Sequence, residues 1–122
     1  MALATLGATV LDCPDPRALA EFYARVLDRT VEGGDDWYEA VGPDGRRLAF
    51  QQVEGYVPPQ WPGTGGSQQF HLDLDVPKER MAEAEEEVLA LGARLVQGDD
   101  GGKRGFRVYL DPVGHPFCLC AC

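Results

Sequence analysis

The sequence predicts an α+β protein made of two tandem βαβββ units that form a curved mixed sheet around a cavity. The stretch Phe106–Cys122 places aromatic and β-branched residues on both sides of a Pro-x-Gly centre, which is typical of two strands joined by a tight turn. The stretch Val41–Val53 has the same pattern around Pro43-Asp44-Gly45. A strand, a helix and a short strand are expected before each hairpin, so each half repeats one plan. Each helix would cover one sheet face and leave the other to line the cavity.

The first half begins with a predicted strand over Leu6–Cys13. Asp15 then offers an N-cap carboxylate and Pro16 the favoured first helical residue. The following apolar residues recur at helical spacing and predict a helix that ends near Asp28: Leu19, Phe22, Tyr23, Val26 and Leu27. Three further strands are expected, at Thr30–Glu32, Trp37–Val41 and Arg47–Val53.

Residues 54–68 are rich in proline and glycine, which disfavours a helix or a central strand and predicts a linker. We therefore divide a single domain, residues 1–122, into repeat one (5–53), this linker and repeat two (69–122). Two linker aromatics, Tyr56 and Trp61, are candidates to cover a cavity or a partner. The alternative is that they pack against their own domain, as aromatic residues more often do.

The second half opens with a strictly alternating segment, Gln69–Asp75, which predicts a strand with one apolar face. His71, Asp73 and Asp75 share the polar face. Pro77 is expected to open the second helix and Gly92 to end it. Its inner stripe is Met81, Ala84, Val88 and Leu91, and its solvated glutamates are Glu79, Glu83, Glu86 and Glu87. A strand at Arg94–Gln97 and a loop at Gly98–Gly105 precede the terminal hairpin.

Composition and charge narrow the classes of function. With 122 residues and 44% hydrophobic content, the chain fits one globular domain. A net charge of −9 disfavours nucleic acid as a partner. The same charge suits a cationic small molecule, although it is also a common means of solubility. No segment is long and apolar enough for a membrane span and no signal leader is recognised, so we expect a cytoplasmic protein.

The four cysteines include Cys118, Cys120 and Cys122 at alternate positions of one predicted strand. Same-strand neighbours of this kind lie ~7 Å apart, too far to share one ion or form a disulfide without bending. We expect reduced thiols that act as small buried hydrophobic residues.

Three motifs within this duplicated plan resemble the vicinal oxygen chelate superfamily. They are Leu-Asp-Cys-Pro-Asp-Pro before the first helix, Phe-His-Leu-Asp-Leu-Asp-Val at the start of the second half and Tyr-Leu-Asp-Pro-Val-Gly-His-Pro-Phe near the end. The superfamily includes glyoxalase I, bleomycin resistance proteins, fosfomycin resistance enzymes and extradiol dioxygenases. The resemblance implies a glyoxalase-like fold over nearly the whole chain, a small-molecule ligand and a homodimer.

In the metal enzymes of this superfamily, the first and last strands of each half each supply one His or Glu ligand to a divalent ion. The resemblance carries the first-strand position of the first half to Ala8, or to Thr9 if the register slips by one. Neither residue is a metal ligand. It carries the last-strand position of that half to Gln51 or Ala49. Of these two, only Gln51 could bind a metal, and its neutral amide is a weak ligand.

The corresponding positions of the second half are His71 and Cys118. The metal enzymes carry Glu at the position that Cys118 occupies here. With one clear ligand, no cofactor is expected. A divalent metal, if bound, would use His71, Cys118 and Gln51. A variant set of His71, Asp73 and Cys118 stays open, because strand alternation puts His71 and Asp73 on one face.

Without a metal, His71 is a candidate general base or ligand-binding donor close to Asp73. The alternative is a histidine satisfied by its neighbours. The expected ligand-binding residues are His71, Asp73, Gln51, Cys118 and Trp37. His115 is expected to be exposed in the hairpin turn. Two strand faces, Arg107 with Tyr109 and Tyr38 with Ala40, are candidates to line the cavity or the dimer contact.

We therefore expect a glyoxalase-like protein that binds a small molecule in the sheet cavity without the usual metal site. One alternative is a divalent-metal-dependent lyase, isomerase or dioxygenase with a divergent ligand set. Another is a dimer that sequesters an antibiotic, as bleomycin resistance proteins do. A dimerisation module without a ligand is the last alternative. Whether the protein is an enzyme stays open at this point.

Overall fold

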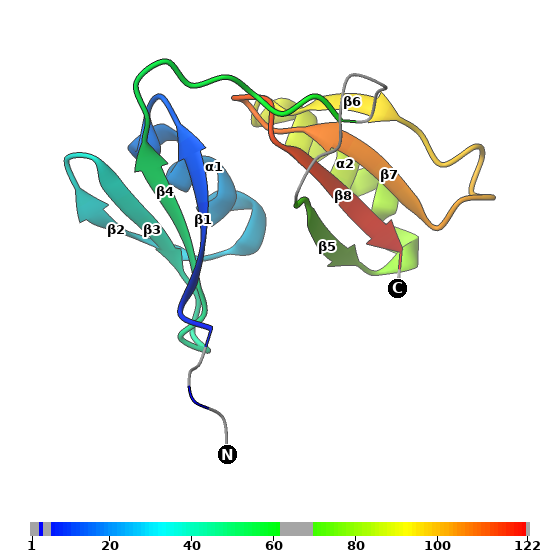
Figure 1. Ribbon diagram of the computed structural model, residues 1–122. Coiled ribbons are helices and arrows are strands. Elements are labelled where there is room, and N and C mark those ends of the chain that lie inside the picture. Colours follow the sequence, from blue (N-terminus) through cyan, green and yellow to red (C-terminus); the bar gives the residue numbers. More distant parts are fainter. Residues whose placement is uncertain (1–2, 4–5, 62–69, 122) are drawn as a thin grey trace. The chain divides into compact units, whose positions relative to one another are not determined.

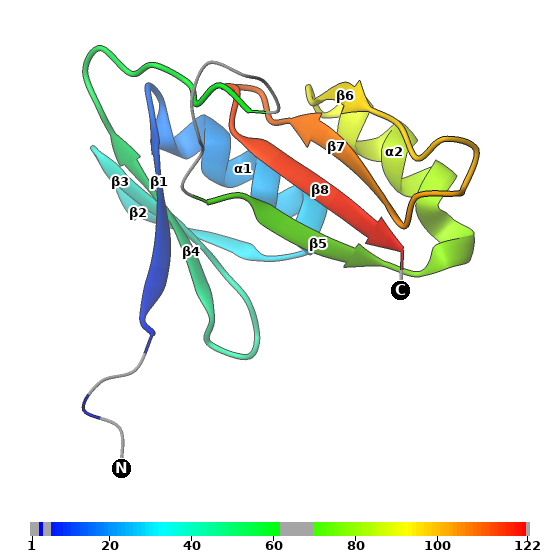
Figure 2. The same cartoon turned by 45° about the vertical axis from the view of Figure 1, so that its right-hand side comes forward.

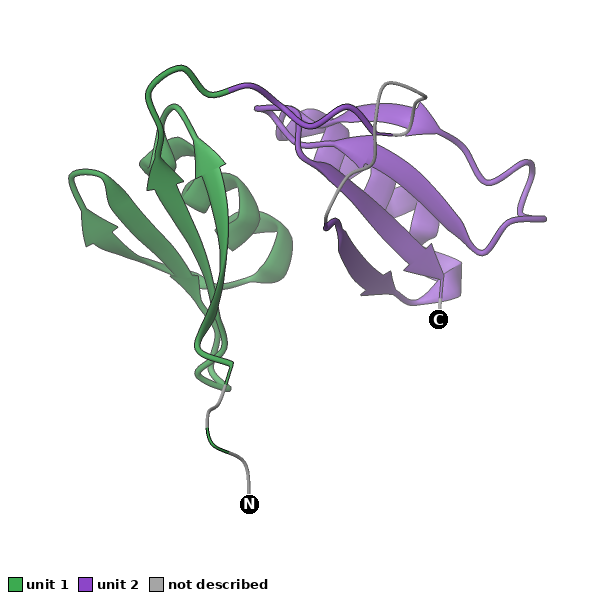
Figure 3. Cartoon of the chain, viewed as in Figure 1, with its two compact units in different colours: residues 1–56 green, residues 57–122 purple. Residues whose placement is uncertain are grey.

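The computed structural model describes residues 3, 6–61 and 70–121. The chain forms two compact units, residues 1–56 and 57–122, which Figure 3 shows in different colours. The division between the units falls inside the predicted linker.

The first unit is a four-stranded mixed sheet with one helix. Its elements are β1 (Ala8–Cys13), α1 (Pro16–Leu27), β2 (Thr30–Gly34), β3 (Trp37–Val41) and β4 (Arg47–Gln52). The strand order is β1-β4-β3-β2, with β1 parallel to β4 and the other pairs antiparallel. The helix lies against one face of this sheet (Figure 2).

Local signals in the sequence fix the ends of α1. The carboxylate of Asp15 accepts a 3.2 Å hydrogen bond from the backbone N–H of Ala18, and the helix ends at Asp28, whose φ of 53° is left-handed. The buried side of the helix packs on the sheet, where Tyr23 stacks on Phe50 of β4 with ring centroids 5.6 Å apart. Both predicted helix ends are therefore confirmed.

The second unit repeats the same plan. Its elements are β5 (Leu72–Val76), a 3₁₀ turn η1 (Lys78–Arg80), α2 (Met81–Ala90), β6 (Arg94–Gln97), β7 (Phe106–Leu110) and β8 (Pro116–Ala121). The strand order is β5-β8-β7-β6, with β5 parallel to β8 and the other pairs antiparallel (Figure 1). The predicted α+β class and the two βαβββ units are confirmed.

The start of the second helix differs from the prediction. Pro77 has an extended ψ of 134° and is followed by the 3₁₀ turn, and the α-helix begins at Met81. No side chain caps either start by a hydrogen bond, so the sequence lacks the capping signal that set the start of α1. Met81 and Val88 are buried as predicted, and the four expected outer glutamates are exposed. The predicted first residue of β5, Gln69, lies outside the described residues.

The turn between β7 and β8 is built around a buried carboxylate. Asp111 is 1% exposed and accepts hydrogen bonds from the backbone N–H groups of Val113 (2.9 Å) and His115 (3.0 Å). Gly114 has a φ of +96°, and a Cβ atom there would lie 2.6 Å from Cβ of Pro58. Pro58 therefore packs directly on a turn residue that has no side chain.

We call residues 57–61, which cross this turn, the strap. His115 is half-buried in this turn, although the sequence predicted it to be exposed.

Neither α1 nor α2 has the combination of length and hydrophobicity that a bilayer-crossing helix needs, and no other helix in the described part of the chain does.

Candidate functional site

The two faces of the second sheet have different roles. Tyr109 and Phe117 are paired across β7 and β8 and stack at 5.4 Å on the face that α2 covers. Because neighbouring residues on a strand alternate in direction, Cys118 lies on the opposite face. The parallel register pairs Asp73 of β5 with Cys118 of β8, so both side chains lie on the face that α2 leaves uncovered, which we call the helix-free face of the unit.

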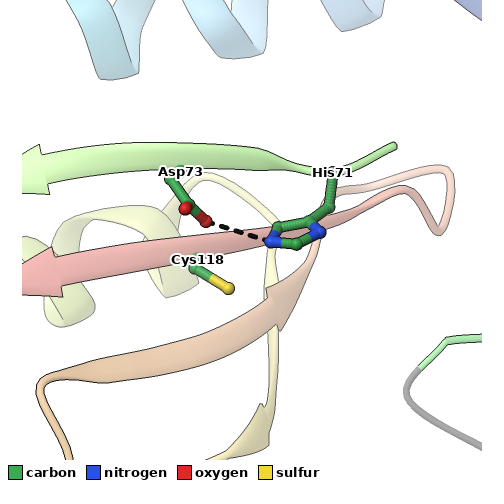
Figure 4. Close-up of side chains that lie close together, drawn as sticks. All are labelled: His71, Asp73 and Cys118. Carbon is green, nitrogen blue, oxygen red and sulfur yellow. Dashed lines mark ion pairs between the residues drawn. The ribbon is translucent and has the colours of Figure 1, made fainter. Parts of the chain in front are cut away.

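Three predicted site residues meet on this face, as Figure 4 shows. The Nε2 atom of His71 lies 3.1 Å from the Oδ1 atom of Asp73. One donor atom each from His71, Asp73 and Cys118 lies within 4.8 Å of the other two. The His71 side chain is 31% exposed and that of Asp73 58%, whereas Cys118 is 3% exposed. The cluster therefore has a buried sulfur and two polar groups that solvent or a ligand can reach.

Cys118 is a neutral thiol. Burial, followed by the negative charge of Asp73 and its hydrogen bond with the thiol, raises the pKa of Cys118 to about 12. A thiol of this kind donates to the carboxylate and is a poor nucleophile, since the thiolate is the reactive form. The cluster is therefore not a nucleophilic cysteine site.

Trp61 of the strap covers one side of His71. The indole and imidazole rings stack with centroids 4.8 Å apart and planes 12° from parallel. The strap thus places an aromatic surface next to a carboxylate and an imidazole, all within the second unit. Trp61 therefore packs against its own unit, and the residue on which it packs is one of the predicted ligand-binding residues.

The other two predicted site residues meet in the first unit. Trp37 of β3 and Gln51 of β4 are direct cross-strand partners. The Trp37 indole N–H donates a 2.9 Å hydrogen bond to Glu39, whose carboxylate also pairs with Arg47 at 3.6 Å. Glu39 is not among the predicted site residues, although its alternation with Trp37 along one strand places the two on the same face.

The first unit offers no metal ligand at its first-strand position. Ala8 is paired with Arg47 on the helix-free face, and Thr9 is paired with Leu48 on the other face. Ala49 is fully buried opposite Glu39, and that carboxylate is already held by Trp37 and Arg47.

A charged network lies under α2, on the strand face that was predicted to line the cavity or a dimer contact. Tyr109 is fully buried, and its hydroxyl donates a 2.8 Å hydrogen bond to Glu85 of α2. Arg107 pairs with Glu85 at 3.2 Å and with Asp99 at 2.7 Å. Tyr109 therefore helps to hold the helix on the sheet and does not line a helix-free face.

The equivalent face of the first unit is also turned to its helix. Tyr38 is the cross-strand partner of Phe50, which stacks on Tyr23 of α1, and Ala40 is fully buried. The helix-free faces instead carry the His71 cluster in one unit and Trp37 with Glu39 in the other.

The first unit also has a hollow of about 680 Å³ near the carboxyl ends of β1 and β4. Its lining includes Pro14, Asp36, Gln52, Glu54 and Tyr56. None of the five predicted site residues lines it.

The fold of the two βαβββ units defines a class of protein, the vicinal oxygen chelate superfamily. A glyoxalase/bleomycin resistance protein/dioxygenase family enzyme from Burkholderia phytofirmans PsJN superposes with a TM-score of 0.72 at 21% identity, covering 95% of this chain and 97% of that one. The model of the Glyoxalase-like domain matches residues 8–120. The chain belongs to this glyoxalase-like family.

Other solved structures share the fold at low sequence identity. The oxidase ChaP-H2 has a TM-score of 0.67 at 20% identity, covering 99% of this chain and 95% of that one. The fosfomycin resistance protein FosX from Listeria monocytogenes, as an E126Q mutant complexed with Mn(II) and 1S,2S-dihydroxypropylphosphonic acid, has a TM-score of 0.69 at 13% identity, covering 98% and 93%. No curated protein matches the chain significantly.

Proposed function

We propose that this protein binds a small organic molecule on the helix-free face of its second unit, at Trp61, His71 and Asp73. The observation that carries the proposal is the stacked Trp61–His71 pair beside an exposed carboxylate. Ligand sites commonly combine an aromatic or apolar surface with a few polar groups that fix orientation. Here the indole supplies the surface, and His71 and Asp73 supply the polar contacts.

The charge of the site favours a ligand with a cationic or hydrogen-bond-donating group. Asp73 lies 3.1 Å from the Nε2 atom of His71, accepts a hydrogen bond from the Cys118 thiol and remains 58% exposed at its side chain. The chain carries a net charge of −9, which attracts cations at long range. An indole face also attracts cations through its quadrupole. A cationic aromatic compound, such as a bleomycin-like antibiotic, meets all three conditions.

The test uses the Trp37→Phe variant, which leaves Trp61 as the remaining tryptophan of two. Matched cationic, neutral and anionic aromatic compounds are titrated while Trp61 fluorescence and the thermal midpoint are recorded. We expect the cationic compounds to quench the fluorescence saturably and to raise the midpoint, because a ligand of the native state stabilises it by mass action.

Two variants separate the proposed site from binding elsewhere. Asp73→Asn should weaken binding of the cations by roughly tenfold or more, the loss usual for a hydrogen bond to a charged group. Asp75→Asn is the matched control, since it lies on the same strand and face but one register step away. Equal affinity in Asp73→Asn and Asp75→Asn, or no binding of any compound, would overturn the proposal.

Sequestration of such a ligand by a cytoplasmic homodimer is the form of this function that we favour. In it, the ligand leaves the complex chemically unchanged, and light scattering at micromolar protein should show twice the chain mass. A monomer that binds the ligand would exclude the dimer while leaving the binding site intact.

A divalent-metal-dependent lyase, isomerase or dioxygenase is the second candidate. The observation that favours it is the meeting of three metal-ligating atoms within 4.8 Å. FosX, a relative in fold, forms a complex with Mn(II). Mass spectrometry of candidate substrates incubated with metal-free and metal-loaded protein tests this function. Metal-dependent conversion supports it, and unchanged substrates across glyoxalase-type and oxygenase-type compounds count against it.

A further inference from the structure

We propose that His71, Asp73 and Cys118 bind zinc or another divalent ion that prefers thiolate, in a site formed by the second unit alone. The inference rests on the second candidate function, because it identifies the metal that such an enzyme would use. It differs from the ligand pattern implied by the resemblance, in which each half supplies ligands. Here the third ligand is Asp73, two residues after His71 on one segment.

The spacing of the three donor atoms suits one small ion. Ligand atoms around tetrahedral zinc lie about 3.3–3.6 Å apart, given bond lengths of about 2.0 Å to nitrogen or oxygen and 2.3 Å to sulfur. The Nε2 and Oδ1 atoms of His71 and Asp73 are already 3.1 Å apart, and no pair in the cluster exceeds 4.8 Å. Side-chain rotations alone could bring the donor atoms to these spacings, so the parallel pairing of β5 and β8 does not have to change.

The donor set selects the kind of ion. A neutral imidazole, a carboxylate and a thiolate carry two negative charges, which balance a divalent cation. Sulfur favours zinc and cobalt over manganese and magnesium, which prefer oxygen ligands. Because the thiolate, and not the thiol, is the form of cysteine that ligates metals, binding of each ion is coupled to loss of the Cys118 proton to solvent.

The cluster also leaves room for a further ligand. Cys118 lies at the buried side, whereas His71 and Asp73 keep 31% and 58% of their side chains exposed. Three protein ligands with an open position are the arrangement of catalytic zinc sites, in which water or a substrate oxygen takes the fourth place. Trp61 fixes the imidazole ring from one side and reports on it by fluorescence.

The experiment titrates Co²⁺ into tag-free, reduced and metal-depleted Trp37→Phe protein. We expect one ion per chain, intense visible absorption typical of tetrahedral cobalt, a near-ultraviolet thiolate-to-cobalt band and quenching of Trp61. Zn²⁺ should displace the cobalt, whereas a tenfold higher concentration of Mn²⁺ should not. A pH indicator in weak buffer should record the release of about one proton per ion.

Variants assign each ligand against a matched control. Cys118→Ser should abolish the near-ultraviolet band, while Cys120→Ser, the next same-face residue of β8, should retain it. Asp73→Asn and His71→Gln should lower the cobalt affinity at least about tenfold, a loss seen even for residues that only hydrogen-bond to a metal ligand. Asp75→Asn and His115→Gln should leave the affinity unchanged.

Three results would overturn the inference: no cobalt binding, a thiolate band that survives Cys118→Ser, or displacement of cobalt by Mn²⁺ as readily as by Zn²⁺. These readouts do not depend on catalysis. Stoichiometric cobalt binding without conversion of any substrate would therefore support the metal site while counting against the second candidate function.

Discussion

The Tyr109 hydroxyl donates a 2.8 Å hydrogen bond to Glu85 and thereby joins β7, near its end, to the middle of α2. Burial, followed by this bond to a carboxylate, raises the pKa of Tyr109 well above its usual value. The phenol therefore stays protonated at neutral pH and can donate to Glu85 there. It makes a polar contact inside the core of the second unit.

Removing this hydroxyl should destabilise the second unit modestly. We expect Tyr109→Phe to lower the free energy of unfolding by about 1 kcal/mol, since Glu85 keeps its pairing with Arg107. Urea denaturation followed by circular dichroism measures the change. Glu86→Ala, at an exposed position of the same helix, should stay within about 0.5 kcal/mol of the parent. Equal effects of the two variants would show that the buried bond contributes nothing.

The pairing of Asp99 with Arg107 should make stability depend on acid. The hydrogen bond from Arg107 lowers the pKa of the Asp99 carboxyl, so this group stabilises the folded state above the usual aspartate pKa of about 3.9. That stabilisation is lost as the pH falls through the lower folded-state pKa. We expect Asp99→Asn to be less stable than the parent at pH 7 and to converge with it in acid.

Asp100→Asn provides the control for this pH profile. Asp100 is exposed, and asparagine tolerates its positive φ of 54°. The stability of the Asp100→Asn variant should follow that of the parent from pH 7 into acid. A gap between Asp99→Asn and the parent that stays constant with pH would contradict the assignment.

The raised pKa of Cys118 predicts a loss of stability in alkali. In the unfolded chain the thiol ionises near pH 8.5, whereas in the folded protein its pKa is about 12. Unfolding therefore releases a proton when the pH lies between these two values. Stability from this group is complete below about pH 8.5 and falls as the pH rises toward the folded pKa. Chemical denaturation at pH 7.5 and pH 10 should show a smaller decline in Cys118→Ser than in Cys120→Ser. A larger decline in Cys118→Ser than in Cys120→Ser would contradict the prediction.

Glu39 and Glu32 should respond oppositely to truncation although they are cross-strand partners. Glu39→Ala removes the acceptor of the Trp37 indole N–H and the partner of Arg47, so we expect a loss of about 1–3 kcal/mol. Glu32 is exposed and faces another carboxylate, and its removal relieves a like-charge pair. We expect Glu32→Ala to be neutral or slightly stabilising in urea denaturation. Equal losses in both variants would refute this assignment.

Much of the fold could be predicted because its signals are local. Asp15, Pro16 and the apolar spacing that follows determine α1 without reference to the rest of the chain. The same holds for β3 and β6, whose observed ends match the prediction. The second helix has no capping side chain, so its start was set by the 3₁₀ turn after Pro77, which periodicity does not reveal.

The candidate site could be predicted only in part, for a related reason. Strand alternation put His71 and Asp73 on one face, and the family resemblance added Cys118. The stacking of Trp61 on His71 depends on the path of the strap, and no pattern in a proline-rich segment encodes that path. The Glu85, Arg107 and Asp99 network likewise requires knowledge of which strand face lies under α2.

The absence of a side chain at Gly114 has a consequence for variation in this protein. The strap is held at two points, by Pro58 against this glycine and by Trp61 on the imidazole of His71. Any larger residue at position 114 must push the proline away, and the indole three residues further along moves with it. If Trp61 and His71 bind the ligand as we propose, a substitution in this turn would then alter selectivity without changing any residue of the proposed site.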